Sequence, residues 1–264
     1  MDQIEFAKAI SDLPLVKQAF FSSIGSTNDV VAEWARQGVK GLALAAADEQ
    51  TRGRGRAGRR WLTPAGSALA FSLLLDLGPG FAPTHLARAS GLGALGVCEA
   101  LERMYTLTPK IKWPNDVLLD GKKTCGVLSE AHWTGGHLQA LILGIGINIA
   151  PQSVPAPDAI NFPATSIRDA LGKPVDAGGL LRAVIERIIA WKEYLGTPEF
   201  IKAWEDRLAY LEDSVYLELD KELIIEAQVE GLAIDGSLRL RLPSGEMRAF
   251  QIGEIQIRPP ADKK

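Results

Sequence analysis

Residues 51–61 read TRGRGRAGRRW, and this one stretch places five arginines within nine residues, at 52, 54, 56, 59 and 60. The whole chain nevertheless carries a net charge of −3, and five fewer positive charges would bring it to −8. The positive charge is therefore local, which argues against a generally basic nucleic-acid-binding protein. Three interpretations stay open: a cage for a small anion, an RNA-binding arginine–glycine segment, or a solvated loop.

The sequence on either side of this arginine loop (residues 51–61) predicts two buried strands. LALAAADEQ at 42–50 and SALAFSLLLDL at 67–77 are apolar runs of strand length. The loop is thus a single short copy between core strands rather than a tail, which favours a small-anion site. Its glycines free the backbone to bend and expose N–H groups, and arginine forks suit phosphate and carboxylate. Trp61 offers an aromatic wall beside them.

Hydrophobic periodicity along the rest of the chain predicts an α/β protein with a small β-rich appendage. The expected elements are helices over 2–11, 26–38, 85–105 and 178–211, strands over 19–21 and 138–149, and a strand–turn–strand over 110–131. From residue 213 onwards, alternating apolar residues separated by turn signals predict a series of short strands. We therefore expect an α/β core over 1–212 and a small β-barrel over 213–264.

Composition excludes several classes of protein. Hydrophobic residues make up 47% and charged residues 23%, which is ordinary for a globular protein. The N-terminal segment has no apolar h-region and no run reaches transmembrane length, so we expect no signal peptide, no membrane span and a cytoplasmic location. Cys98 and Cys125 form no C-x-x-C pair, which predicts reduced packing residues. The three histidines show no ligand spacing, and we expect no metal site formed by the protein alone.

Two polar segments outside the arginine loop are candidates for ligand binding. Gly25–Asp29, GSTND, reads either as an N-cap cluster or as a helix N-terminus that presents hydroxyls, an amide and backbone donors to a polar ligand. In Lys112–Asp116, KWPND, the proline restricts Trp113 to an extended conformation, so that Asn115 and Asp116 form a bend beside a strand end. This second segment is either an ordinary turn or a site in which Asp116 holds a metal ion or a lysine.

Two glycine-containing segments complete the set. Residues 120–126, DGKKTCG, resemble a P-loop only superficially, because Lys123 stands where serine or threonine belongs. They read either as a solvated hairpin or as a turn with one lysine pointing inward to neutralise a carboxylate or phosphate. Residues 143–148, LGIGIN, lack the third glycine of a Rossmann motif. In a buried strand these glycines indicate something flat lying on the backbone, with Asn148 able to recognise a base at the strand end.

The order in which these segments occur is more specific than any one of them. Together they resemble a biotin–protein ligase through S-T-N at 26–28, E-Q-x-x-G-R-G-R-x-G-R-x-W at 49–61, K-W-P-N-D at 112–116, G-K-K-x-x-G-V-L at 121–128 and G-I-G-I-N at 144–148. The resemblance extends more loosely through the C-terminal strands. Only about twenty residues precede the matching region, where bifunctional members carry a winged-helix DNA-binding domain. The chain therefore resembles a monofunctional member.

The resemblance implies a fold and a reaction. The fold would be a mixed sheet flanked by helices, related to class II aminoacyl-tRNA synthetase catalytic domains, followed by an SH3-like barrel. Biotin and Mg-ATP would give biotinyl-5′-adenylate and pyrophosphate, and a lysine of a biotin carboxyl carrier protein or other biotin-acceptor domain would then attack the mixed anhydride. Cations would lower the repulsion between the biotin carboxylate and the ATP α-phosphate. The implied partners include no DNA and no membrane, and several relatives form homodimers through the sheet edge.

The family pattern also assigns roles to residues of this sequence. Biotin binding would involve Ser26, Thr27, Asn28, Gln50, Arg54, Gly55, Arg56, Lys123, Gly126 and Leu128. Nucleotide binding would involve Arg54, Arg56, Trp61 on the adenine side, Asn115, and Asn148 as the reader of adenine. The catalytic candidates are Lys123, Arg54 and Lys112, with Lys123 ranked first for its spacing to Gly126. Asp116 is the one candidate for contact with the magnesium of Mg-ATP. The arginine loop would close over the adenylate and reopen, so we expect it to be mobile without ligand.

Two competing functions stay open. A lipoate–protein ligase uses the same two-step logic, but its usual motif R-R-x-S-G-G-G-A differs from GRGRAGRR at 53–60. Lipoate also lacks the ureido group that Ser26, Thr27 and Gln50 could hydrogen-bond. A nucleic-acid-binding regulator would use the arginine loop without chemistry, with steep salt-dependent affinity and no pyrophosphate release. The acidic remainder of the chain disfavours this regulator.

Overall fold

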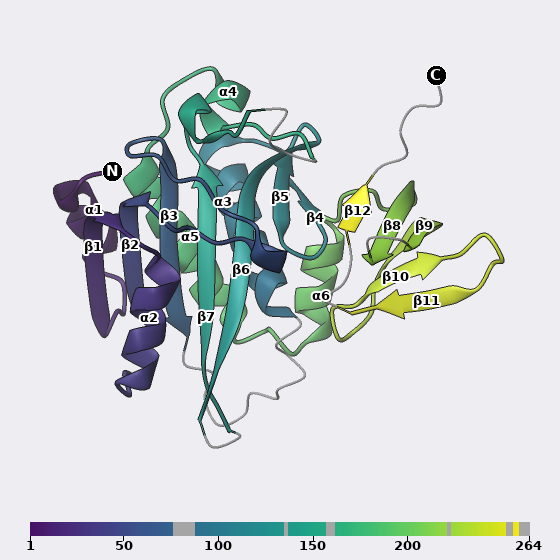
Figure 1. The fold of residues 1–264 in the computed structure, drawn as a ribbon, viewed down its shortest axis with the longest axis horizontal. Coiled ribbons are helices and arrows are strands. Elements are labelled where there is room, and N and C mark those ends of the chain that lie inside the picture. The colour runs from purple at the N-terminus through teal and green to yellow at the C-terminus, as the bar shows by residue number, and fades with distance from the viewer. Residues whose placement is uncertain (76–87, 135–136, 157–161, 221–222, 252–255, 259–264) are drawn as a thin grey trace.

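A mixed sheet of seven strands forms the framework of the protein (Figure 1). The structure, a computed structural model, describes residues 1–75, 88–134, 137–156, 162–220, 223–251 and 256–258. The strand order is β1-β2-β3-β7-β6-β5-β4, and only the β1–β2 pair is parallel within the described residues. These strands are β1 (Lys17–Ile24), β2 (Ala43–Gln50), β3 (Ala68–Leu75), β4 (Lys110–Lys112), β5 (Asp116–Leu119), β6 (Lys122–Thr134) and β7 (His137–Asn148).

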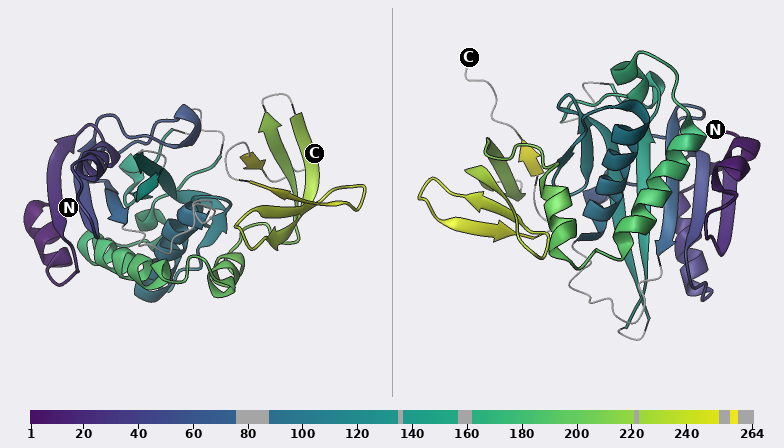
Figure 2. Two further views of the ribbon diagram at one scale, coloured as in Figure 1. Left: turned by 90° about the horizontal axis from the view of Figure 1, so that it is seen from below. Right: turned by 180° about the vertical axis from the view of Figure 1, so that it is seen from behind.

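Helices cover both faces of this sheet. In the described part of the chain they are α1 (Gln3–Ile10), α2 (Thr27–Arg36), α3 (Ala89–Tyr105), α4 (Ile167–Leu171), α5 (Ala177–Lys192) and α6 (Pro198–Glu205), with short 3₁₀ turns η1 (Arg56–Gly58) and η3 (Pro151–Ser153). Helices α3 and α5 pack together on one face, as the view from behind in Figure 2 shows, and α2 packs on β2, β3 and β7. The expected mixed sheet flanked by helices is therefore confirmed.

Alternation along β3 divides its side chains between these two helical layers. Leu69, Phe71 and Leu73 join the large core that includes α3 and α5, whereas Leu74 joins the smaller core under α2. Successive strand residues point to opposite faces, so Ser72 lies on the α2 face of the sheet. The α2 face of the sheet becomes the floor of the site described below.

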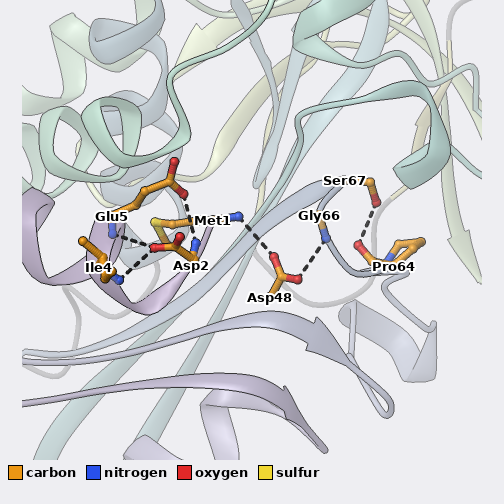
Figure 3. A network of polar contacts seen from close by, with 8 residues as sticks. All are labelled: Met1, Asp2, Ile4, Glu5, Asp48, Pro64, Gly66 and Ser67. Carbon is orange, nitrogen blue, oxygen red and sulfur yellow. Dashed lines mark hydrogen bonds and ion pairs between the residues drawn. The ribbon is translucent and has the colours of Figure 1, made fainter.

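Polar contacts fix the start of α1 and the end of β2. Helix α1 begins with a capping box, in which Asp2 accepts the Glu5 backbone N–H and Glu5 accepts the Asp2 N–H (Figure 3). At the end of β2, one Asp48 oxygen accepts from the Met1 ammonium at 3.2 Å and the other from the Gly66 N–H at 3.1 Å. Asp48 thereby ties the segment that follows the arginine loop to β2.

The C-terminal strands form a separate antiparallel sheet, in the order β11-β10-β9-β8-β12. They are β8 (Ser214–Asp220), β9 (Leu223–Leu232), β10 (Leu238–Arg241), β11 (Met247–Phe250) and β12 (Gln256–Arg258). The turn between β9 and β10 is held by two side chains from outside this sheet: the Trp113 indole N–H donates to Gly236 O at 2.9 Å, and the Arg88 guanidinium donates to Ile234 O. The expected β-rich C-terminal appendage is therefore present as a small antiparallel sheet.

The helix expected over 85–105 begins at Ala89 in the described chain, and residues 85–87 lie outside the described residues. The region expected to be helical over 178–211 contains two helices, because Thr197 caps α6 and Pro198 occupies its first turn. Cys98 and Cys125 are buried and unpaired, as predicted. None of the helices in the described ranges has the length and apolar character needed to cross a membrane.

Candidate functional site

Small residues form a floor on the α2 face of the sheet. The register pairs Ala70 of β3 with Gly146 of β7, Gly146 with Gly126 of β6, and Gly126 with Asp116 of β5. Paired residues point to the same side of a sheet, so these four positions form one row across four strands. The row leaves space above the central strands and ends at a carboxylate.

The arginine loop folds back over this floor and places an aromatic ring on it. Its shape is set by backbone hydrogen bonds from Gly55 N to Arg59 O at 2.7 Å and from Trp61 N to Gly53 O at 3.0 Å. The Trp61 indole lies on the backbone of Gly146 and touches Gly126, where a Cβ would overlap or crowd the ring. The indole N–H is buried and has no hydrogen-bond partner among the described residues.

A second flat group lies on the neighbouring glycine of β7. The side-chain amide of Asn28 rests on Gly144, and a Cβ at that position would overlap the amide oxygen. The flat groups that the two glycines of residues 143–148 accommodate in this structure are therefore side chains of the protein itself.

Two lysines converge on the carboxylate at the end of the floor. Lys123 Nζ lies 2.5 Å from one oxygen of Asp116, and Lys112 Nζ lies 3.4 Å from the other. Burial raises the pKa of the Asp116 carboxyl, but the two ammonium groups lower it by more. Burial lowers the pKa of Lys112 more than Asp116 raises it. Lys123 Nζ also lies 5.6 Å from the centroid of the Trp61 ring.

One arginine of the loop points toward this cationic group (Lys112, Asp116, Lys123). Arg56 donates to Asn115 Oδ1 at 3.3 Å. Burial lowers the pKa of Arg56, and the nearby Asp116 carboxylate partly offsets that effect. Together with Arg56, the group therefore combines three cations with a single acid, and the surplus positive charge suits an anionic ligand.

Arg54 points the other way, toward acidic residues of α2 and β6. Its guanidinium lies 2.7 Å from Asp29 and 3.6 Å from Glu130. Partial burial lowers the pKa of Arg54, but these two carboxylates raise it by more. The other loop arginines, Arg52, Arg59 and Arg60, are exposed. Arg60 donates a hydrogen bond to the Thr51 carbonyl at 3.4 Å. Arg54 and Arg56 are thus separated by the structure although the loop places them two residues apart.

A chain of polar side chains lies beside the floor. Gln50 Oε1 accepts from the Thr27 backbone N–H at 2.8 Å and lies 3.0 Å from Thr27 Oγ1. Thr27 Oγ1 lies 2.7 Å from Ser72 Oγ, and Ser72 donates to Asn28 Oδ1 at 2.5 Å. The chain ends where Asn28 Nδ2 donates to Glu130 Oε2 at 2.6 Å.

The polar chain consists of Gln50, Thr27, Ser72, Asn28 and Glu130. The sequence motifs did not identify two of these residues, Ser72 and Glu130, as part of the site. Ser72 is the polar residue within the run ALAFSLLL of β3, and Glu130 interrupts the apolar part of β6. Each is a signal of a buried or half-buried polar group, but neither reveals its partner. The partners lie on α2, 44 and 102 residues away from them in the sequence.

The remaining residues predicted from sequence lie around the cationic group and the polar chain. Ser26 is the buried N-cap residue of α2, although its side chain makes no capping hydrogen bond. Leu128 pairs with Gly144, which places it on the floor in the row next to Gly126. Gly55 lies in the arginine loop itself. Asn148 is buried at the end of β7, and its amide donates to Thr165 O at 3.1 Å, so it stands apart from the polar chain.

The described residues contain no group of three or more side chains suited to hold a metal ion. Asp116 is the carboxylate within the cationic group, and its two oxygens face two ammonium groups. A magnesium ion there would depend on oxygen ligands from a bound polyphosphate, because Mg²⁺ is usually held by one or two carboxylates together with substrate phosphates.

Residues 20–148, which include nearly all of the residues described above, match the biotin/lipoate A/B protein ligase family. The chain is also 34% identical over 222 residues to the biotin--[acetyl-CoA-carboxylase] ligase of Paracoccus denitrificans, and the match covers 79% of this chain and 88% of that protein. The chain therefore belongs to the biotin/lipoate A/B protein ligase family, and the resemblance predicted from its motifs is confirmed.

One further relative and one solved structure show how much of the chain is matched. The bifunctional ligase/repressor BirA of Bacillus spizizenii is 35% identical over 162 residues, which cover 61% of this chain and 49% of that protein. The matching part of the chain thus spans about half of the length of that relative. Among solved structures, the biotin protein ligase from Aquifex aeolicus in complex with biotin and ATP has a TM-score of 0.76 and 31% identity, covering 93% of this chain and all of that one.

Proposed function

We propose that the chain is an ATP-dependent biotin–protein ligase. It activates biotin as biotinyl-5′-AMP with release of pyrophosphate, and then transfers biotin to a lysine of a biotin carboxyl carrier protein domain. The observation that carries the proposal is the pairing of two different groups on one floor of small residues. The polar chain at Thr27 suits an uncharged hydrogen-bonding head group, and the cationic group at Lys123 suits the reacting carboxylate and phosphate.

In the first step, a carboxylate oxygen of biotin attacks the α-phosphorus of ATP, an O–P bond forms, and pyrophosphate leaves. Both reactants are anions, and the barrier contains their mutual repulsion. Lys123, Lys112 and Arg56 present three cations in one partly buried place, where electrostatic interactions are stronger than in water. Binding both reactants against the same strands would lower the activation barrier further, because their relative orientation is fixed before the reaction.

In the second step, the amine of the acceptor lysine attacks the carbonyl carbon of the mixed anhydride. An amide bond forms, the bond between the carbonyl carbon and the phosphate oxygen breaks, AMP leaves, and the amine nitrogen releases one proton to solvent. The same three cations face the phosphate that departs as a charged group, so they stabilise negative charge in both steps. Magnesium bound to the ATP phosphates would neutralise charge on the leaving pyrophosphate. Asp116 is the nearest protein carboxylate for that ion.

Residue roles follow from this arrangement. We assign biotin binding to the residues named from sequence on the polar chain and floor: Ser26, Thr27, Asn28, Gln50, Gly126 and Leu128. We assign the phosphate to Arg56, Lys123 and Lys112, with Asn115 as the support of Arg56. Arg54 and Gly55 would shape the loop over the ligand, Trp61 would cover it, and Asn148 would contact the adenine.

The proposal extends to organisation and partners. We assign the reaction to residues 1–212, in a fold related to class II aminoacyl-tRNA synthetases, and an SH3-like barrel to residues 213–264. β1 is one of the two edge strands of the main sheet in the described structure, which supports a homodimer formed along its edge. We propose a cytoplasmic protein that acts without DNA, because two of its loop arginines face inward to protein groups.

An isotope-exchange assay tests the first half-reaction. ATP–pyrophosphate exchange is measured with biotin, with lipoate and with no acid, using the wild type, Lys123→Ala and Lys122→Ala. We expect biotin-dependent exchange that collapses in Lys123→Ala. Lys122 is an exposed neighbour on the same hairpin, so its variant should retain exchange. Exchange with lipoate alone would assign the chain to the lipoate ligases, and exchange with neither acid would refute the proposed function.

A further inference from the structure

Four side-chain oxygens of the polar chain stand in a line of three short contacts. Asn28 Oδ1 to Ser72 Oγ is 2.5 Å, Ser72 Oγ to Thr27 Oγ1 is 2.7 Å, and Thr27 Oγ1 to Gln50 Oε1 is 3.0 Å. Thr27, Asn28 and Ser72 are at most 5% exposed. Two oxygens at these separations in a buried place need a hydrogen between them.

Both ends of this line are fixed as acceptors. A carboxylate without a proton can only accept, so the Asn28 amide must turn its nitrogen toward Glu130 and its oxygen toward Ser72. At the other end, the backbone N–H of Thr27 points at Gln50 Oε1 from 2.8 Å. A backbone N–H can only donate, so the Gln50 amide must present its oxygen there.

The line is consequently one hydrogen short. Each hydroxyl carries one hydrogen, so Ser72 and Thr27 together supply two for three contacts. Ser72 uses its hydrogen on Asn28 Oδ1, and Thr27 then has one hydrogen for both Ser72 Oγ and Gln50 Oε1. One pair of close oxygens therefore lacks a hydrogen between them, which is unfavourable until another donor satisfies one of them.

We infer that Glu130 is a specificity-determining positioning residue, which keeps this line short of one hydrogen and thereby selects an acid whose head group carries N–H donors. It acts through the Asn28 amide and not by touching the ligand. Arg54, 3.6 Å away, holds the Glu130 carboxylate in place. A cyclic urea has the required N–H groups, whereas the dithiolane ring of lipoate has none. The inference rests on the proposed function and explains how this site would separate the two acids.

Replacing Glu130 by glutamine should remove the shortage of one hydrogen. A glutamine amide can turn its nitrogen toward Asn28, and Asn28 can then turn its own nitrogen toward Ser72. That rotation supplies the missing hydrogen from within the protein, because Ser72 becomes free to donate to Thr27 and Thr27 to Gln50. The site of Glu130→Gln therefore no longer needs a donor from the ligand.

Calorimetric titration with two ligands tests the inference. One ligand is biotin, and the other is its cyclic carbonate analogue, in which oxygen replaces each ureido N–H with little change of shape. In the wild type we expect biotin to bind far more tightly than the carbonate. In Glu130→Gln we expect biotin to bind about tenfold more weakly, the size expected for one buried hydrogen bond, with no loss for the carbonate.

Asp29→Asn is the matched control, because it distinguishes an effect that comes through Arg54 from one that comes through the Glu130–Asn28 bond. It weakens the other carboxylate contact of Arg54 and leaves the Glu130–Asn28 bond in place, so the biotin-to-carbonate ratio should stay at the wild-type value. Ser72→Ala is a second route to the same end, because it removes two of the three contacts and one hydrogen. The remaining Thr27–Gln50 contact is then satisfied, and the ratio should fall as in Glu130→Gln.

The outcomes are distinguishable. A wild type that binds biotin, together with an unchanged ratio in Glu130→Gln or in Ser72→Ala, overturns the inference and leaves the proposed function standing. A ratio that falls equally in Asp29→Asn overturns it as well, since Arg54 would then be the cause. A wild type that binds no biotin refutes the proposed function and the inference with it.

Discussion

The indole of Trp61 lies directly on the backbone of Gly146, although 85 positions separate the two residues in the chain. Gly146 lies between Ala70 and Gly126 in the floor, so the ring rests on a strip of backbone with almost no side chains. The ring therefore closes the floor from above and depends on the absence of a Cβ beneath it.

Gly146→Ala should displace the Trp61 ring. A methyl group there overlaps the indole, and either the ring or the strand must move, which costs about 1–3 kcal/mol of unfolding free energy as overpacking. Urea unfolding measures the loss. Gly178→Ala on α5 is the matched control, because its Cβ would meet its neighbours at 3.6 Å or more and alanine favours a helix. Equal stability of Gly146→Ala and wild type would contradict the contact.

Lys123→Met should destabilise the protein in a pH-dependent way. In the wild type the lysines hold the pKa of Asp116 below its unfolded value of about 3.9, so this stabilisation is present above that pH and is lost as pH falls through the folded pKa. Without Lys123 the buried carboxylate keeps only the 3.4 Å contact to Lys112. We expect a loss of about 3 kcal/mol at pH 7.

The difference between wild type and Lys123→Met should shrink as the pH is lowered from 7 toward 3, because protonation of Asp116 removes the uncompensated charge. Chemical denaturation at several pH values measures it. Lys112→Met should show the same trend with a smaller amplitude, since its contact with Asp116 is longer. A difference that stays constant over this pH range would show that Lys123 contributes by packing alone.

Arg54 and Arg56 should fail differently when replaced by methionine. Arg56 lies at the cationic group, so Arg56→Met should lower the rate of biotin-dependent pyrophosphate exchange by about a hundredfold, as loss of a charge-stabilising donor does. Arg54 is paired with Asp29 and Glu130, so Arg54→Met should act mainly on the biotin concentration at half-maximal rate. Steady-state exchange kinetics separate the two effects, and a reversed order would show that Arg54 is the residue at the phosphate.

Sequence patterns predicted the local features of this molecule well. Apolar runs on both sides of the arginine loop predicted β2 and β3, and the Asp120–Gly121 turn predicted the β5–β6 hairpin. These signals depend on period and turn chemistry within about ten residues, so they do not require knowledge of the tertiary structure. The contact of Asp116 with a lysine, one of three interpretations of KWPND beside a metal site and an ordinary turn, is also present.

Long-range register decided what the sequence could not reveal. Whether Ser72 faces α2 or α3 depends on the pleat of β3 within the sheet, and a shift of one residue would reverse it. Glu130 meets Asn28 only because β6, β7 and β3 bring Leu128, Gly144 and Ser72 into one row under α2. The opposite directions of Arg54 and Arg56 likewise follow from the fold of the loop over this floor.

Trp113→Phe should loosen the C-terminal sheet. The substitution removes the indole N–H that donates to the buried Gly236 carbonyl between β9 and β10, at a cost of about 1–2 kcal/mol. Hydrogen exchange should therefore accelerate more in residues 223–250 than in β3 and β7. Trp204→Phe loses the same atoms from an indole whose N–H has no partner in the described structure. It should accelerate both regions alike, and the same uniform response in Trp113→Phe would contradict a specific role for the bond.

The arginine loop should be cleaved by trypsin without ligand and protected when biotin and ATP are bound. Exposed Arg52, Arg59 and Arg60 offer cleavage sites. The contacts that hold this segment to the rest of the chain include the Arg52–Gly25 backbone bond, the Arg54 ion pairs, the Arg56–Asn115 bond and the Trp61 ring. Trypsin requires a locally unfolded substrate segment, so cleavage reports opening of the loop. Mass spectrometry of the fragments locates the cuts within residues 52–60.

Three samples make the proteolysis decisive: protein alone, protein with biotin, and protein with biotin and ATP. Bound adenylate would add phosphate contacts to loop arginines, and cleavage within 52–60 should slow by about tenfold, the factor that corresponds to roughly 1.4 kcal/mol of added local stability. Cleavage at Arg36, an exposed site at the end of α2, serves as the internal reference and should not change. A loop that resists trypsin in the free protein, and resists it equally with both ligands, would mean that the closed arrangement seen over Gly146 is permanent and that substrate enters by another route.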